Sequence, residues 1–112
     1  MKVGKNSSFS EYSLFGSAGG ITIGDNVIAG QNVRFHAENH NYSDLNKLIV
    51  EQGVSRKGIS VGHNCWIGAG AVFLDGSSIG SGCVVGANAV VTKQFPDNVI
   101  IGGVPARILA YR

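Results

Sequence analysis

The sequence predicts an all-β protein in which short strands wind into a parallel β-helix. Three observations predict it: a period of six residues, Asn or Gly at the fourth position of each six, and a small residue at the fifth. From Val61 the chain divides into VGHNCW, IGAGAV, FLDGSS, IGSGCV and VGANAV. A six-residue unit with one large apolar residue is too short for an amphipathic helix, but it fits a short strand and a turn.

The fourth position of each unit is expected to turn a corner, because Asn and Gly adopt positive φ at low cost. Three units then form a triangular coil of eighteen residues. First-position side chains stack inside, and successive coils pair about 4.8 Å apart. The predicted corners are Asn26, Asn32, Asn64, Gly70, Gly76, Gly82 and Asn88.

The repeat frame predicts about four coils in a single domain over residues 1–112. One imperfect coil covers residues 3–20, a second covers 23–40, and two more cover 61–78 and 79–96. The pattern fails between His40 and Gly58, so we expect an inserted loop at 41–58 and a C-terminal tail at 97–112. A loop of that length inside a compact solenoid indicates a function.

Composition excludes several classes of partner. The charged fraction is 14%, the net charge is +2, and the cations are scattered, so nucleic-acid binding is not expected. No run of eighteen apolar residues predicts membrane insertion, and no apolar run follows the basic start as in a secretory signal. Cys65 and Cys83 form no CxxC motif and suit a reducing compartment, so we expect a cytoplasmic protein.

Four segments, in order, resemble the hexapeptide-repeat acyltransferases. They are NH at 39–40, KGISVGHNCWIGAGAV at 57–72, VVGANAVVTKQFP at 84–96 and GGVPARI at 102–108. The resemblance covers residues 21–112 and is greatest to the O-acetyltransferases of polysaccharide biosynthesis and to the galactoside, maltose and xenobiotic acetyltransferases. It implies a left-handed β-helix, a homotrimer with sites at the subunit boundaries, acetyl-CoA as co-substrate, and a saccharide or other small-molecule acceptor.

The resemblance places the general base at His40, at the foot of the inserted loop. Imidazole titrates near neutral pH and can remove the proton of an acceptor hydroxyl or amine. Because the thioester is already activated, direct attack needs no covalent enzyme intermediate. Asp44, ranked first, and Glu38 are candidates to orient the imidazole, although a backbone carbonyl would serve equally well.

The resemblance also implies residues for the two substrates. Asn39 and Trp66 are candidates for the acceptor; Trp66 precedes a first-position Ile and should point outward, either into the site or against another subunit. Small residues would leave room for the pantetheine arm, and cations would meet the phosphates of the nucleotide. The residues implied for acetyl-CoA are Gly68, Ala69, Gly86, Ala87, Thr92, Lys93, Pro105 and Arg107.

Two alternatives stay open. The γ-class carbonic anhydrases share this fold and bind zinc between subunits with three histidines; this chain has His36, His40 and His63. That class pairs two histidines five residues apart on one coil, whereas Gly68 follows His63 at that spacing, so no metal is expected. The second alternative is a non-catalytic scaffold or a fragment, since the chain lacks much of the N-terminal region that shapes the acceptor site in typical members.

Overall fold

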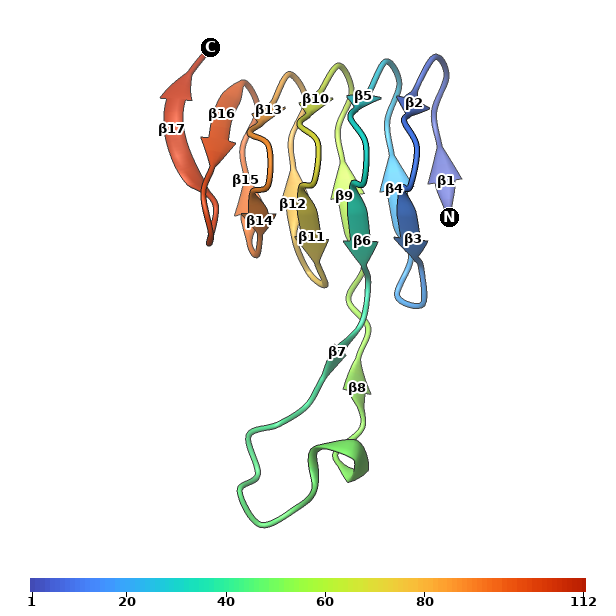
Figure 1. Ribbon diagram of the computed structural model, residues 1–112, viewed down its shortest axis with the longest axis vertical. Coiled ribbons are helices and arrows are strands. Elements are labelled where there is room, and N and C mark those ends of the chain that lie inside the picture. Colours follow the sequence, from blue (N-terminus) through green and yellow to red (C-terminus); the bar gives the residue numbers. More distant parts are fainter.

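The computed structural model describes residues 1–112 as a stack of β coils with one long excursion (Figure 1). The strands are β1 (Lys2–Val3), β2 (Ser8–Phe9), β3 (Leu14–Gly16), β4 (Ile21–Ile23), β5 (Ile28–Ala29), β6 (Arg34–His36), β7 (Asn39–His40), β8 (Val54–Ser55), β9 (Ile59–Val61), β10 (Trp66–Ile67), β11 (Val72–Leu74), β12 (Ser78–Ile79), β13 (Val84–Val85), β14 (Val90–Val91), β15 (Gln94–Phe95), β16 (Val99–Gly102) and β17 (Arg107–Tyr111).

The coils form a prism with three faces, each of them a sheet. Sheet A has the order β1-β4-β9-β12-β15, sheet B the order β2-β5-β10-β13-β16-β17, and sheet C the order β3-β6-β11-β14. Every pairing in these sheets is parallel except that of β16 with β17. Four coils contribute a strand to each face, in agreement with the predicted number.

The last coil extends further than expected. Within the segment expected to be a tail, β16 (Val99–Gly102) continues sheet B by pairing in parallel with β13. Val99 and Ile101 are fully buried, so they extend the apolar column by part of a fifth coil. Strand β17 then folds back antiparallel along β16 and covers its free edge, which is otherwise a site for unwanted strand pairing.

All seven predicted corners adopt positive φ. The values lie between 54° at Asn64 and 84° at Gly76. The weaker N-terminal coil turns in the same way at Asn6 and Tyr12. The corner prediction is confirmed because the left-handed backbone conformation is a local requirement that the residue type at the fourth position meets directly.

The core is a column of first-position side chains. Phenylalanines from three coils stack along it: the ring centroids of Phe15 and Phe35 lie 5.3 Å apart, and those of Phe35 and Phe73 lie 4.8 Å apart. Cys65 and Cys83, at the fifth position of successive coils, are buried and not disulfide-bonded. Burial raises the pKa of the Cys65 thiol, which keeps it protonated and unreactive at neutral pH.

A ladder of side chains joins the coils at the corner between sheets A and B. The N–H of Lys5 donates to Asp25 Oδ1 (2.8 Å), and that of Asp25 donates to His63 Nδ1 (2.8 Å). The N–H of His63 donates to Ser81 Oγ (2.9 Å), and that of Ser81 donates to Asp97 Oδ1 (2.8 Å). His63 is exposed, as expected, but its ring is an acceptor in this ladder.

Glycine at the second position lets neighbouring coils approach closely, which makes Gly62→Ala a sharp test of the fold. A Cβ on Gly62 would lie 2.5 Å from the backbone carbon of Gly80 and from the nitrogen of Ser81. Because backbone cannot give way cheaply, we expect a loss of about 1–3 kcal/mol in the free energy of unfolding. Urea denaturation measures this loss.

Gly86→Ala is the matched control for that substitution. A Cβ there would meet nothing closer than 3.5 Å, so the free energy of unfolding should change by less than about 1 kcal/mol. Equal stability of the two variants would show that close packing of the coils at Gly62 is not required.

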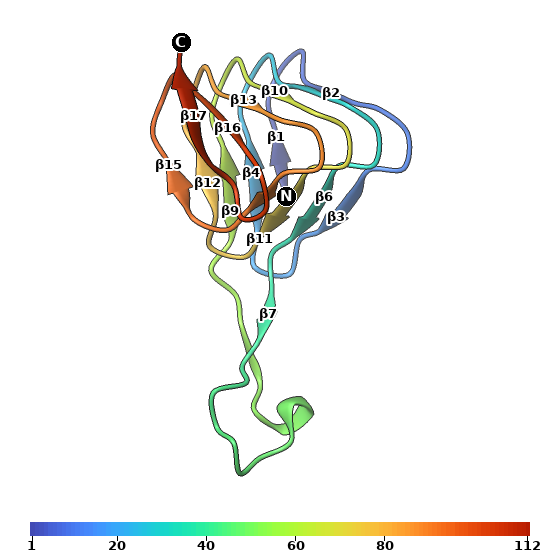
Figure 2. The same ribbon diagram turned by 60° about the vertical axis from the view of Figure 1, so that its left-hand side comes forward.

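The excursion leaves the prism between β6 and β9, at the corner between sheets C and A. It begins and ends in a two-stranded antiparallel ladder of β7 and β8, and its tip contains η1 (Ile49–Glu51). The excursion projects clear of the coils in both views (Figures 1 and 2). The helix η1 has only three residues, far fewer than a membrane-spanning helix needs.

A buried carboxylate fixes the point where the excursion rejoins the coils. Asp75, 7% exposed, accepts the backbone N–H of Lys57 at 2.9 Å and that of Gly58 at 2.8 Å. Charge-assisted hydrogen bonds of this kind are about twice as strong as neutral ones. The foot of the excursion is therefore held firmly against the coil below it.

Candidate active site

His40 lies in β7, at the foot of the excursion, and its side chain is exposed. It borders two hollows. One, of about 350 Å³, is lined by Asn39, His40, Asn41, Tyr42, Ser43, Ser55 and Lys57. The other, of about 460 Å³, is lined by Gly16, Ser17, Ala18, His36, Ala37, Glu38 and His40. Both hollows are open to solvent, and His40 borders each of them.

Hydrogen bonds next to His40 hold the two arms of the excursion together. The N–H of Asn41 donates to the Gly53 carbonyl (3.0 Å), and its side-chain amide donates to the Gln52 carbonyl (3.2 Å). The hydroxyl of Ser55 donates to Asn41 Oδ1 (2.8 Å). This network limits movement of the backbone that carries the imidazole, as a positioned general base requires.

Both carboxylates predicted as orienting groups have other partners. Glu38 Oε2 lies 3.0 Å from Arg56 Nε in an ion pair. Asp44 Oδ1 accepts the N–H of Asn46 at 2.9 Å, within a turn of the excursion. Neither carboxylate forms a hydrogen bond or an ion pair with His40 in this protomer. Glu38 nevertheless lines the same hollow as the imidazole.

The three histidines lie in different environments. His36, in β6, is partly buried and shares a hollow with His40. His63 lies at the corner between sheets A and B and accepts the backbone N–H of Asp25. The structure contains no cluster of three or more His, Cys, Asp or Glu side chains that could hold a metal ion.

One protomer does not bring the two predicted acceptor residues together. Trp66 points outward from sheet B, is 60% exposed, and lies in register between Ile28 and Val84. Asn39 lies next to His40 at the foot of the excursion, at the corner between sheets C and A. A site that uses both residues therefore needs two subunits.

The positions implied for acetyl-CoA lie at the two corners that bound sheet C. Gly68, Ala69, Gly86 and Ala87 stack at the corner between sheets B and C, where a Cβ on Gly68 would lie 2.6 Å from Ala87 N. Thr92 and Lys93 follow β14 and lie at the other corner, between sheets C and A.

The tail closes the C-terminal end of sheet C. The N–H of Ala106 donates to the Val90 carbonyl at 2.9 Å, which places Pro105 and Arg107 beside β14. Lys93 Nζ lies 5.5 Å from the ring centroid of Phe95, and both Lys93 and Arg107 are exposed. Neither cation lines one of the hollows described at His40.

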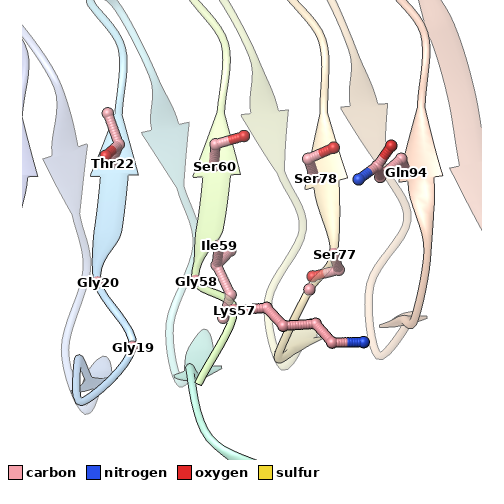
Figure 3. A pocket seen from close by; sticks show the side chains of 11 residues that line it. Gly19, Gly20, Thr22, Lys57, Gly58, Ile59, Ser60, Ser77, Ser78 and Gln94 are labelled. Atoms are coloured by element: carbon pink, nitrogen blue, oxygen red, sulfur yellow. The ribbon is translucent and has the colours of Figure 1, made fainter. Parts of the chain in front are cut away.

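A third hollow was not expected from the sequence. It has a volume of about 400 Å³ and lies over the outer face of sheet A, beside the foot of the excursion (Figure 3). Lys57 lines this hollow and also the hollow of about 350 Å³ at His40. No sequence signal marks Lys57, because a lysine next to a loop is usually an ordinary surface residue.

Coils of six-residue units, interrupted by one excursion with a histidine at its foot, define a hexapeptide-repeat protein. Residues 58–93 match the family model described as bacterial transferase hexapeptide (six repeats). The galactoside O-acetyltransferase of Escherichia coli (strain K12) is 38% identical over 89 residues, which are 80% of this chain and 43% of that enzyme. The chain is thus a hexapeptide-repeat protein related to sugar acetyltransferases.

Two solved structures of acetyltransferases have a fold similar to that of this chain. A maltose O-acetyltransferase from Clostridium difficile 630 has a TM-score of 0.90 at 33% identity, covering 97% of this chain and 57% of that one. A hexapeptide-repeat acetyltransferase from Vibrio cholerae has a TM-score of 0.88 at 31% identity, covering 97% and 61%. The predicted family and the left-handed β-helix are confirmed. The chain spans about half the length of the curated relatives that it matches.

Proposed function

We propose that this protein is an acetyltransferase that moves an acetyl group from acetyl-CoA to a hydroxyl or amine of a sugar-type acceptor, with His40 as the general base. The observation that supports it best is the exposed imidazole of His40. It lies at the foot of the excursion, whose two arms are joined by hydrogen bonds, and it borders two open hollows. The relatives named as galactoside and maltose O-acetyltransferases support the same chemistry.

In the proposed reaction, His40 accepts a proton from the hydroxyl or amine of the acceptor. At the same time the oxygen or nitrogen of that acceptor group attacks the thioester carbonyl carbon. The resulting oxyanion is stabilised by backbone N–H groups at a coil corner. When the intermediate collapses, the carbon–sulfur bond breaks and the CoA thiolate takes the proton from the imidazolium. Acetylated acceptor and free CoA leave, and His40 is neutral again.

A homotrimer would complete this site, and the three faces of the prism support it. The outer residues of sheet B include Ile28 and Trp66, both 60% exposed, and sheet C exposes Leu14 (47%). The outer residues of sheet A are polar. A cyclic trimer uses two different surfaces of each subunit, so sheet B can pack on sheet C, where Leu14 lies beside Arg34, while the polar sheet A stays in water. Packing of sheet B on sheet C would bring the Trp66 face of one subunit towards His40 of the next.

The proposed function is tested by measuring the release of CoA thiol from acetyl-CoA with a panel of sugars and amino sugars. Acceptor-dependent release, with an acetylated product seen by mass spectrometry, is the expected result. Light scattering on the same sample should give three times the chain mass. A folded trimer that transfers acetyl to none of the acceptors would favour the scaffold or fragment alternative.

Lys93 and Arg107 are predicted to bind the phosphates of acetyl-CoA. Replacing either residue by alanine should raise KM for acetyl-CoA about tenfold, the loss expected for one charge-assisted hydrogen bond. Acetyl-pantetheine lacks the nucleotide, so its KM should be the same in the variants and in the wild type. Lys47→Ala, in the excursion, is the control. If KM rose equally for acetyl-CoA and for acetyl-pantetheine, these residues would not be binding the phosphates.

A further inference from the structure

The hollow over sheet A has an ordered wall of polar side chains. Thr22, Ser60, Ser78 and Gln94 lie in register on four successive strands and point outward (Figure 3). They form a line of hydroxyl and amide groups parallel to the helix axis. Such a line can hydrogen-bond to several hydroxyls of one saccharide, whereas the outer residues of sheet B at Ile28 and Trp66 are apolar.

Lys57 extends along one side of this hollow. Its aliphatic stem passes over Gly76, where an added Cβ would lie 3.3 Å from Lys57 Cδ. Figure 3 shows the side chain running from the start of β9 across the corner that precedes β12. Lys57 also lines a hollow at His40, so the two hollows have this residue in common.

The ammonium of Lys57 has no carboxylate partner. Arg56 is the basic side chain that forms an ion pair, and its partner is Glu38. Asp75 is the acidic residue bound to the Lys57 backbone, but its two oxygens accept backbone N–H groups. Lys57 is therefore a cation whose charge is not neutralised within the protomer.

A buried serine lies behind the outward line of polar side chains. Ser77, 1% exposed, lines the same hollow, and its hydroxyl has no hydrogen-bond partner. Buried hydroxyls nearly always have one, because leaving one unpaired costs about 1–3 kcal/mol. The Ser77 oxygen itself has almost no accessible surface, so a ligand in the hollow would bind the outward hydroxyls of sheet A and the Lys57 ammonium instead.

We propose that this hollow is an acceptor subsite, in which Lys57 binds the carboxylate or phosphate of an anionic saccharide while the hydroxyl to be acetylated lies at His40. The inference rests on the proposed function and makes Lys57 a determinant of acceptor specificity. The ammonium is a compact point charge suited to either anion. The line of Thr22, Ser60 and Ser78 hydroxyls would bind the rest of the sugar.

The test compares glucuronic acid and glucose 6-phosphate with neutral glucose as acceptors. In the Lys57→Met variant, which keeps the length of the stem and removes the charge, the ratio of kcat/KM for anionic over neutral acceptor should fall about tenfold. Lys57→Arg should keep most of the preference. Lys47→Met, which removes a lysine from the excursion, is the matched control. A Lys57→Met variant with the wild-type ratio would overturn the inference.

Binding without acetyl-CoA separates this inference from the proposed function. NMR titration of the wild type should show glucuronate or glucose 6-phosphate shifting the signals of Ser60 and Ser78, with at least about fivefold weaker binding to Lys57→Met. If these shifts occur and no thiol is released, the subsite stands and the proposed function fails. If inorganic phosphate binds as tightly as glucose 6-phosphate, the hollow is an anion site without a saccharide role, and the inference is wrong.

Discussion

Replacing His40 by alanine is expected to lower kcat/KM for acetyl transfer at least about a hundredfold, the usual scale for the loss of a general base. His40 is exposed at the foot of the hairpin and borders two hollows. Its replacement removes a proton acceptor but no buried contact, so the fold should persist. Thiol release with the best acceptor of the sugar panel measures the effect, and circular dichroism and light scattering check folding and assembly.

His63→Asn is the matched control for that loss. The asparagine oxygen can still accept the Asp25 N–H that His63 Nδ1 accepts in the corner ladder, so both stability and transfer should stay near the wild-type values. His36→Ala tests the second histidine at the hollow. If His40→Ala transfers acetyl at the wild-type rate, the base is another group, and a large loss in His36→Ala would identify it.

Replacing Phe35 by alanine is expected to have the largest effect on stability. The side chain is fully buried and lies between the rings of Phe15 and Phe73 in the column. Large-to-small replacement of a buried phenylalanine costs about 3–5 kcal/mol through lost apolar contact and the cavity left behind. Because domains of this kind are stable by only about 5–15 kcal/mol, urea denaturation should show a much lower midpoint or a largely unfolded chain.

Two further variants show whether the loss arises from the cavity. Phe35→Leu keeps most of the volume and should cost less than about 1.5 kcal/mol. Leu14→Ala removes a side chain that is 47% exposed on the outer face of sheet C, and it should cost less than Phe35→Ala. Equal losses in Phe35→Leu and Phe35→Ala would mean that the column does not depend on close packing at this position.

The features that the sequence predicted correctly depend on local backbone conformation and side-chain periodicity. A corner needs a residue that adopts positive φ, and Asn64 or Gly70 meets that need whatever lies around it. The inward direction of Phe73 and the outward direction of Trp66 follow from alternation along a strand. Cys65 and Cys83, at the small fifth position of successive coils, are buried in the stack for the same local reason.

Other features depend on contacts between residues far apart in the chain. The partner of His63 is Asp25, and the two meet only because the excursion returns the chain to the next coil in register. Glu38 could be expected near His40 from its position in the sequence, but Arg56, across the hairpin, takes its carboxylate. The fifth coil was missed because the corner between β14 and β15 is two residues short, so Phe95 pairs in register with Ile79 and Ile101 with Val85.

The sequence by itself determined the β-helix, its corners, its column of apolar side chains and the placement of His40 at an interruption, because each follows from residue types at a short and regular spacing. Only the tertiary structure decided what surrounds His40. It placed Lys57 between two hollows, left the Ser77 hydroxyl without a partner, and put Trp66 on another face of the prism. Such contacts depend on how separate coils and the excursion pack, and a local repeat does not encode that arrangement.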